Sequence, residues 1–203
     1  MSGKVYIASM NMRGSWAPAP PNTVILNVTS AQGKLNKNRR DFSPMTPVEG
    51  GYKGYWNFES YWQSGKVFLD IPHNVSKQWW QTLTEPKRRY PGSKNKQVLH
   101  AKFDHIEENL DYINSRKRVY VPEYYELIRN KKQTQYWKDK INSGINVVIY
   151  DFDGPRNIDG SVKCEEVNLN QLREKINDPT FPFGHGYVVA GTILGINPEQ
   201  YII

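Results

Sequence analysis

The chain is organised around residues 51–68, GYKGYWNFESYWQSGKVF, where aromatic rings and polar groups alternate densely. Asn57 has a side chain suited to a helix N-cap, so we expect a helix to begin at Phe58. Helical spacing predicts an apolar stripe that faces a core and a polar stripe on the neighbouring face: Phe58, Trp62, Gly65 and Leu69 in the first, and Glu59, Gln63 and Lys66 in the second.

The polar stripe has two interpretations. In the first it is the solvated face of an amphipathic helix, which is the common case and the one that helical periodicity alone favours. In the second, its carboxylate, amide and ammonium groups line the wall of a ligand site.

The 203 residues are enough for one domain with a substantial core, and we expect a single domain over residues 1–203. Aromatic residues make up 13% of the chain, which indicates a folded protein. The sequence predicts strands at 4–9, 23–29 and 146–150, a basic loop at 34–40, and further helices from about 74 or 76 to before 86, and at 93–114, 122–144 and 169–176.

The formal net charge is +7, and the positive side chains concentrate in three segments. They are KLNKNRR at 34–40, KRRYPGSKNK at 87–96 and SRKR at 115–118. A basic surface of this kind favours polyanions, either nucleic acid or phosphorylated metabolites.

Cys164 is the only cysteine, which excludes an internal disulfide and a cysteine-based zinc site. The N-terminal residues MSGKVYIASM match neither a signal peptide nor a transit sequence, and no apolar run approaches the roughly twenty residues of a membrane span. We therefore expect a soluble, cytoplasmic protein with no membrane partner.

Two carboxylates follow the buried strand in VVIYDFDGP (147–155). Asp151 and Asp153 are two residues apart, so both would project toward one face, where they could hold Mg²⁺ or serve in acid–base chemistry. A plain turn with one capping aspartate is the alternative. The motif also resembles the first motif of haloacid-dehalogenase phosphotransferases, which have threonine at the position of Pro155 and need more downstream chain than is present here.

Other catalytic patterns are missing from the sequence. His100 and His105 lack the i, i+4 spacing of helical metal ligands, and His73 and His185 are isolated, so we expect no metal site. There is no phosphate-binding loop, no serine nucleophile motif and no base near Cys164, and no cofactor is expected. The remaining groups suit cleavage of an N-glycosidic bond, in which a carboxylate stabilises an oxocarbenium-like state while cations hold phosphate and aromatic rings stack on a base.

Ordered motifs along the chain resemble the NADAR family. FSPM (42–45), the turn at 52–54 and FESYWQSGK (58–66) resemble its FSN- or FSP-like start, its glycine turn and its E-H-Y-x-Q-x-x-K helix. RRYPGSKNKQVLHAKF (88–103) resembles its basic loop and helix, NVVIYDFDGP (146–155) its strand with an acidic end, and GHGYVVAGTILG (184–195) its glycine-led final helix.

This resemblance implies a helix-rich α+β fold with a small sheet, in which a NADAR-like core of about 42–195 follows an N-terminal β extension, 1–41. It implies N-glycosidase activity on ADP-ribosylated nucleic acid or on a phosphorylated riboside. Ser60 stands where the family usually has histidine, and Gly154–Pro155 replace its Trp-Gly, which leaves the substrate open.

The resemblance matches Glu59, Gln63 and Lys66 to residues of the family's helix and Asp151 or Asp153 to its later acidic residue, and the other assignments follow from residue type. Glu59 would stabilise the oxocarbenium ion or activate water, and Asp151 or Asp153 would assist. The ligand-binding residues would be Trp56, Trp62, Gln63, Lys66, Arg88, Arg89, Lys102 and His185.

A non-catalytic function is the alternative. The chain also resembles an uncharacterised family of tailed-phage proteins, which implies the host cytoplasm as its location and reversal of an ADP-ribosylation defence as its context. Such a protein could instead bind nucleic acid or a host protein through its basic, aromatic surface.

Overall fold

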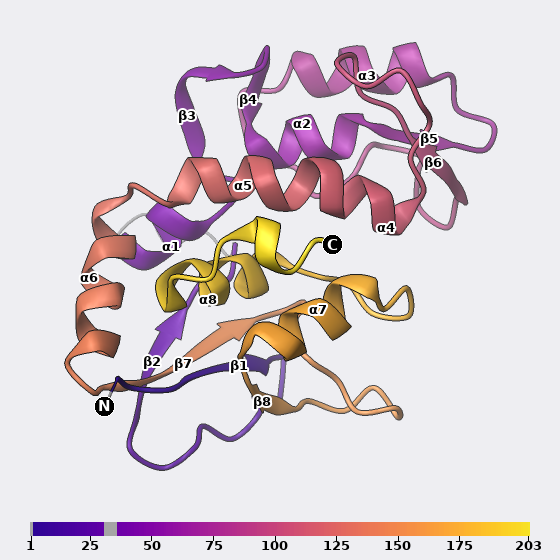
Figure 1. Cartoon of the computed structure of the whole chain (residues 1–203). Coiled ribbons are helices and arrows are strands. Elements are labelled where there is room, and N and C mark those ends of the chain that lie inside the picture. The colour runs from indigo at the N-terminus through magenta and orange to yellow at the C-terminus, as the bar shows by residue number, and fades with distance from the viewer. Residues whose placement is uncertain (1, 31–35) are drawn as a thin grey trace. The chain divides into compact units, whose positions relative to one another are not determined.

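A computed structural model describes residues 2–30 and 36–203 of the chain (Figure 1). The protein has the α+β fold that the sequence predicts. Contacts between Cα atoms divide it into two compact units: unit 1 comprises Met1–Ser43 and Val121–Ile203, and unit 2 comprises Pro44–Tyr120. This division differs from the expected boundaries, which place a core at 42–195 after an extension at 1–41.

Unit 1 contains a four-stranded sheet in the order β2-β7-β1-β8. Strand β7 is parallel to both of its neighbours, whereas β8 is antiparallel to β1. The strands predicted at 4–9, 23–29 and 146–150 are confirmed, and β8 is an addition. The strands are β1 (Val5–Ser9), β2 (Thr23–Asn27), β7 (Asn146–Asp151) and β8 (Cys164–Glu166).

The expected N-terminal extension belongs to this sheet. Both β1 and β2 pair with β7, whose apolar run is buried as expected for a central parallel strand. Strands β1 and β2 therefore complete the sheet of unit 1 instead of adding to a core formed without them.

Helix α8 packs against β1 and β7, and α5, α6 and α7 contact it in turn (Figure 1). It is apolar on all sides, which is typical of a fully buried helix. The helices of unit 1 are α1 (Lys37–Phe42), α5 (Val121–Ile128), α6 (Lys132–Asn142), α7 (Leu169–Asn177), α8 (His185–Leu194) and the 3-10 helix Pro198–Gln200.

Two expectations for unit 1 were wrong. Of the predicted basic loop at 34–40, residues 34 and 35 lie outside the described residues, and α1 begins at Lys37 because Asn36 accepts hydrogen bonds from two backbone N–H groups of the first turn. The single helix expected at 122–144 is divided between α5 and α6. At the break the Thr134 hydroxyl donates to the Ile128 carbonyl at 2.6 Å, which satisfies the end of α5.

Unit 2 is built from two antiparallel strand pairs and short helices (Figure 1). Strands β3 and β4 are joined by Lys53 and Gly54, both at positive φ (50° and 83°), as in a type I′ hairpin turn. The elements are β3 (Pro47–Tyr52), β4 (Tyr55–Asn57), α2 (Phe58–Ser64), β5 (Lys66–Phe68), α3 (His73–Gln81), β6 (Val98–Ala101), α4 (Tyr112–Ser115) and the π-helix Arg116–Tyr120.

The core of unit 2 is aromatic. The Phe58 ring lies 5.4 Å from Tyr120, the Tyr61 ring lies 5.4 Å from Phe103, and Trp62 stacks on Phe103 at 5.9 Å between centroids. Edge-to-face and offset contacts of this kind stabilise aromatic clusters beyond the area that they bury.

The prediction of a single helix at 93–114 was wrong. Ala101 pairs with Lys66 of β5 and, through a bridge, with Leu110, so this segment satisfies its backbone in extended form. Val98 and Leu99 of β6 are 44% and 48% exposed.

Helix α2 ends earlier than the polar stripe requires. Its last residue is Ser64, so Lys66 lies in β5 and not on the helix, and Leu69 is 46% exposed. Gly65 ends the helix where a Cβ atom would lie only 2.4 Å from ring atoms of Phe103. Close packing of that ring therefore requires glycine at this position.

Candidate functional site

The start of α2 fixes the position of Glu59. The Asn57 side chain accepts a hydrogen bond from Ser60 N at 2.7 Å, which confirms the predicted N-cap, and donates one to the Met45 carbonyl at 2.9 Å. Glu59 N donates to the Pro44 carbonyl at 2.9 Å. These bonds tie the first turn of the helix to the segment before β3.

Glu59 and Gln63 lie on one side of α2, as their spacing predicts. Gln63 Nε2 donates to Glu59 Oε1 at 2.7 Å, and both side chains are half-buried. The hydrogen bond orients the carboxylate, and partial exposure leaves this side of the helix accessible to solvent. The polar stripe is thus an ordered pair of groups, without Lys66.

The two tryptophans predicted to bind ligand differ in their surroundings. Trp62 stacks on Phe103 and packs edge-on against the Tyr120 ring, with 4.9 Å between the ring centroids. It therefore packs α2 against the aromatic core. Trp56 is half-buried in β4 immediately before the N-cap.

The predicted phosphate-binding cations are dispersed over unit 2. Lys66 is half-buried in β5, Arg88 and Arg89 are exposed after α3, and Lys102 is exposed after β6. The structure does not gather these side chains on the helix that carries Glu59.

A cavity of about 180 Å³ opens on another side of α2. The helix contributes Tyr61 and Ser64 to it, whereas Glu59 and Gln63 do not line it. Among the predicted ligand-binding residues, only Lys102 does. The full lining is Lys53, Tyr55, Tyr61, Ser64, Lys77, Lys102, Phe103, Asp104 and His105.

The cavity is lined by charged side chains together with buried aromatic ones. Lys77 Nζ contacts both carboxylate oxygens of Asp104, at 2.5 and 2.7 Å, and this hydrogen bonding holds the pKa of Asp104 below its usual value. Lys53 Nζ lies 5.0 Å from the centre of the Tyr61 ring, within cation–π range. Burial raises the pKa of Tyr55, so its hydroxyl keeps its proton at neutral pH.

In unit 1, Asp151 supports the first turn of α8. It is 1% exposed, its Oδ2 accepts a hydrogen bond from Gly186 N at 2.8 Å, and it lies 3.4 Å from His185 Nδ1. His185 Nε2 is 2.6 Å from the Val28 carbonyl oxygen. A Cβ atom on Gly186 would lie 2.8 Å from Asp151 Cβ, so glycine is needed for this close approach.

Asp153 has a different environment. It is exposed, although Gly184 adjoins both aspartates: a Cβ atom there would lie 2.5 Å from Asp153 Cβ and 2.8 Å from Asp151 Oδ2. The two carboxylates thus share a neighbourhood, as their spacing predicts, but only Asp151 is buried. Its contacts with backbone N–H and imidazole give it a structural role at the helix terminus.

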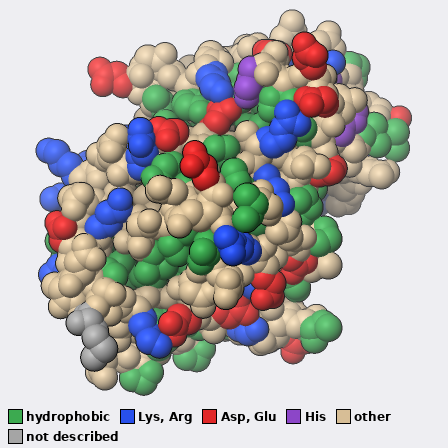
Figure 2. All heavy atoms as spheres, viewed as in Figure 1, with side chains coloured by type: hydrophobic (Ala, Val, Ile, Leu, Met, Phe, Trp, Pro, Cys, Tyr) green, Lys and Arg blue, Asp and Glu red, His purple; other side chains and the backbone are tan. Residues whose placement is uncertain are grey.

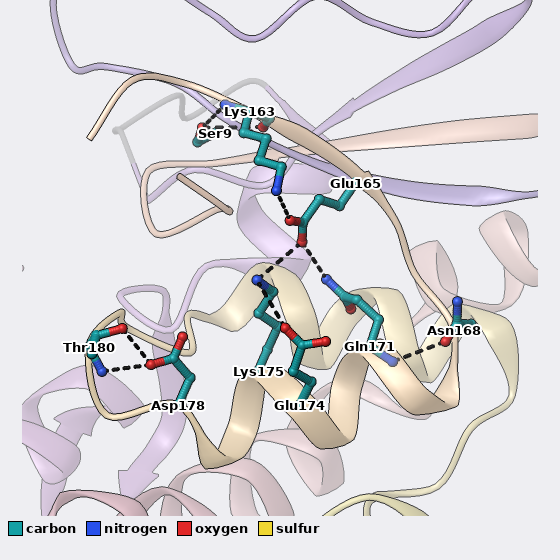
Figure 3. A network of polar contacts seen from close by, with 9 residues as sticks. All are labelled: Ser9, Lys163, Glu165, Asn168, Gln171, Glu174, Lys175, Asp178 and Thr180. Atoms are coloured by element: carbon teal, nitrogen blue, oxygen red, sulfur yellow. Dashed lines mark hydrogen bonds and ion pairs between the residues drawn. The ribbon is translucent and has the colours of Figure 1, made fainter. Parts of the chain in front are cut away.

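A second polar cluster lies between β8 and α7 (Figure 3). Glu165 contacts Lys163 Nζ at 2.6 Å, Gln171 Nε2 at 3.1 Å and Lys175 Nζ at 3.4 Å. The negative charge of Glu165 is therefore offset by the ammonium groups of Lys163 and Lys175. Within residues 2–30 and 36–203, no three His, Cys, Asp or Glu side chains gather as a metal site would require.

The predicted site residues belong to both units. Asp151, Asp153 and His185 are in unit 1, and the others are in unit 2. The structure brings Glu59 to Gln63, and Asp151 to His185. Sequence reasoning missed the cavity residues Lys53 and Lys77. Of these, Lys53 had a sequence signal, because it lies in the turn expected at 52–54.

In the part of the chain that the structure describes, no helix combines the length and apolar character needed to cross a membrane. Comparisons with protein-family models, with curated proteins and with solved structures gave no match to this chain.

Proposed function

We propose that this protein hydrolyses the N-glycosidic bond of an ADP-ribosyl or ribosyl-phosphate adduct, with Glu59 as the catalytic carboxylate. The observation that carries the proposal is the hydrogen bond from Gln63 to Glu59 on the Asn57-capped helix. It supplies an oriented, partly exposed carboxylate beside aromatic side chains. The ordered motifs that resemble the NADAR family give further support.

The reaction breaks the bond between the anomeric carbon and a base nitrogen, and the bonding electrons pass to that nitrogen. Glu59 stabilises the positive charge on the sugar and accepts a proton from the attacking water, whose oxygen bonds to the anomeric carbon. The leaving nitrogen takes up a proton from solvent. Gln63 holds the Glu59 carboxylate in place, and Lys66, Arg88 and Arg89 are proposed phosphate partners.

The test is Glu59→Gln, which keeps the size of the side chain and removes its charge. We expect the release of ADP-ribose from ADP-ribosylated DNA, or of ribose phosphate from riboside phosphates, to fall by about 10² to 10⁴. Glu107→Gln is the matched control, because Glu107 is an exposed carboxylate of the same unit. Wild-type protein that releases neither product, or Glu59→Gln protein of wild-type activity, would exclude the enzyme.

A further inference from the structure

The cavity beside α2 is assembled from four separate segments of unit 2. Lys53 comes from the β3–β4 turn, Tyr61 from α2, Lys77 from α3, and Lys102 from the segment after β6. Segments this far apart in sequence place ammonium groups around a single space. The cavity therefore differs from a solvated helix face, where neighbouring charges come from one element.

The lining carries an excess of positive charge. Three ammonium groups, those of Lys53, Lys77 and Lys102, accompany one carboxylate, Asp104, so the formal charge of the lining residues is +2 with His105 neutral. Asp104 is engaged by Lys77. Among the described residues, none forms an ion pair with Lys102.

The floor of the cavity is buried and largely aromatic. Tyr55, Tyr61 and Ser64 are buried, and Phe103 lies against them. Low-polarity walls strengthen the attraction between the lysines and an anion, because the effective dielectric constant beside them is lower than in bulk water. The Ser64 hydroxyl donates to the Tyr61 carbonyl at 2.7 Å and also hydrogen-bonds with Tyr55, so these hydroxyl groups hold the floor together and leave the lysines as the donors for an anion.

We propose that this cavity binds a phosphate monoester group, with Lys53, Lys77 and Lys102 as its cationic partners. A monoester carries close to two negative charges at pH 7, which matches the excess charge of the lining, whereas a diester carries one. Tyr61 and Phe103 provide an apolar wall for the group that bears the phosphate.

This site is distinct from the one proposed for hydrolysis. Glu59 lies on a different side of α2 from Tyr61 and Ser64, so binding in the cavity does not require the Glu59 carboxylate. The two proposals can therefore fail separately: Glu59→Gln protein should bind phosphate with wild-type affinity even where it is inactive.

Isothermal titration calorimetry at low salt tests the proposal, with inorganic phosphate, adenosine 5′-monophosphate and its 3′,5′-cyclic diester as probes. We expect phosphate and the monophosphate to bind and the diester to bind at least about tenfold more weakly. Tighter binding of the nucleotide than of inorganic phosphate would show that the aromatic wall contacts the attached group, and equal binding would show that the phosphate is recognised by itself. Either outcome supports the site.

Lys102→Gln is the decisive variant, because it removes one cavity charge from an exposed side chain and should not affect folding. We expect it to weaken monophosphate binding by about tenfold, as for a lost charge-assisted hydrogen bond. Lys94→Gln removes the same charge from an exposed position of unit 2 that does not line the cavity, and should change affinity by less than about twofold. Equal losses in the two variants, equal binding of monoester and diester, or no binding by the wild type would overturn the proposal.

Discussion

At the residue scale, Glu165 is the carboxylate whose neighbours are best defined (Figure 3). Burial alone would raise its pKa, but hydrogen bonds from Lys163 and Gln171 and the charges of Lys175 and Lys163 outweigh it, so the pKa lies below its ordinary value of 4.5. Because folding lowers this pKa, the ionised carboxylate stabilises the fold above pH 4.5, and the contribution disappears as the pH falls through the folded-state value.

Glu165→Gln should therefore lower the thermal midpoint at pH 7, and the difference from the wild type should shrink steadily below about pH 4.5. Thermal unfolding followed by circular dichroism between pH 3 and pH 7 measures it. Glu174→Gln is the control, because the Glu174 side chain is 76% exposed and 3.9 Å from Lys175. A pH-independent difference for Glu165→Gln would contradict the assignment.

At the scale of single elements, the packing at the end of α2 depends on the absence of a side chain at Gly65. A methyl group there would overlap the Phe103 ring, so Gly65→Ala should lower the free energy of unfolding by about 1–3 kcal/mol. Urea unfolding measures the loss.

A second substitution, at Phe103, distinguishes overlap with the ring from the change in backbone conformational freedom that replacing a glycine also causes. If overlap with the ring is responsible, Gly65→Ala should cost less in a Phe103→Leu background, because a smaller side chain then faces the methyl group. Additive losses in the double variant would contradict the steric explanation.

The local signals in the sequence predicted some elements well. Asn57 predicted the start of α2 because its side chain caps the helix, and the apolar run at 146–150 predicted β7. The helix expected at 93–114 failed because β6 pairs with β5 and the Ala101–Leu110 bridge overrides helical spacing. Nothing local in the sequence reveals such pairing.

In the candidate sites too, contacts within one element could be predicted from the sequence, whereas contacts between distant segments could not. Glu59 and Gln63 are four residues apart on one helix, so their contact was predictable from spacing. The prediction for Lys66 was wrong because α2 ends at Ser64 and Lys66 pairs with Ala101, which lies far along the chain. The cavity was missed because its lysines are brought together only by tertiary structure.

At the scale of the whole molecule, the formal net charge of +7 favours polyanions. On the face shown in Figure 2, Lys and Arg side chains are interspersed with acidic ones. Local groups of cations, such as exposed Arg88 and Arg89, are candidate contacts for nucleic acid.

If Arg88 and Arg89 contact phosphates, Arg88→Gln/Arg89→Gln should reduce the slope of log affinity for DNA against log salt by about two. Fluorescence anisotropy with labelled DNA at several salt concentrations measures that slope. Lys131→Gln/Lys132→Gln removes the same charge from exposed positions of unit 1. Equal effects of the two double variants would indicate general attraction by net charge instead of a defined contact.

The order of strands in unit 1 also determines when the sheet can form during synthesis. β1 and β2 leave the ribosome early, yet they do not pair with each other, because β7 lies between them. The nascent chain must therefore carry two partnerless strands until residues 146–151 emerge, whereas Pro44–Tyr120 is contiguous and is completed earlier. Such distant pairing slows folding and exposes strand edges, so this protein should depend on chaperones at the stage when β7 is still being translated.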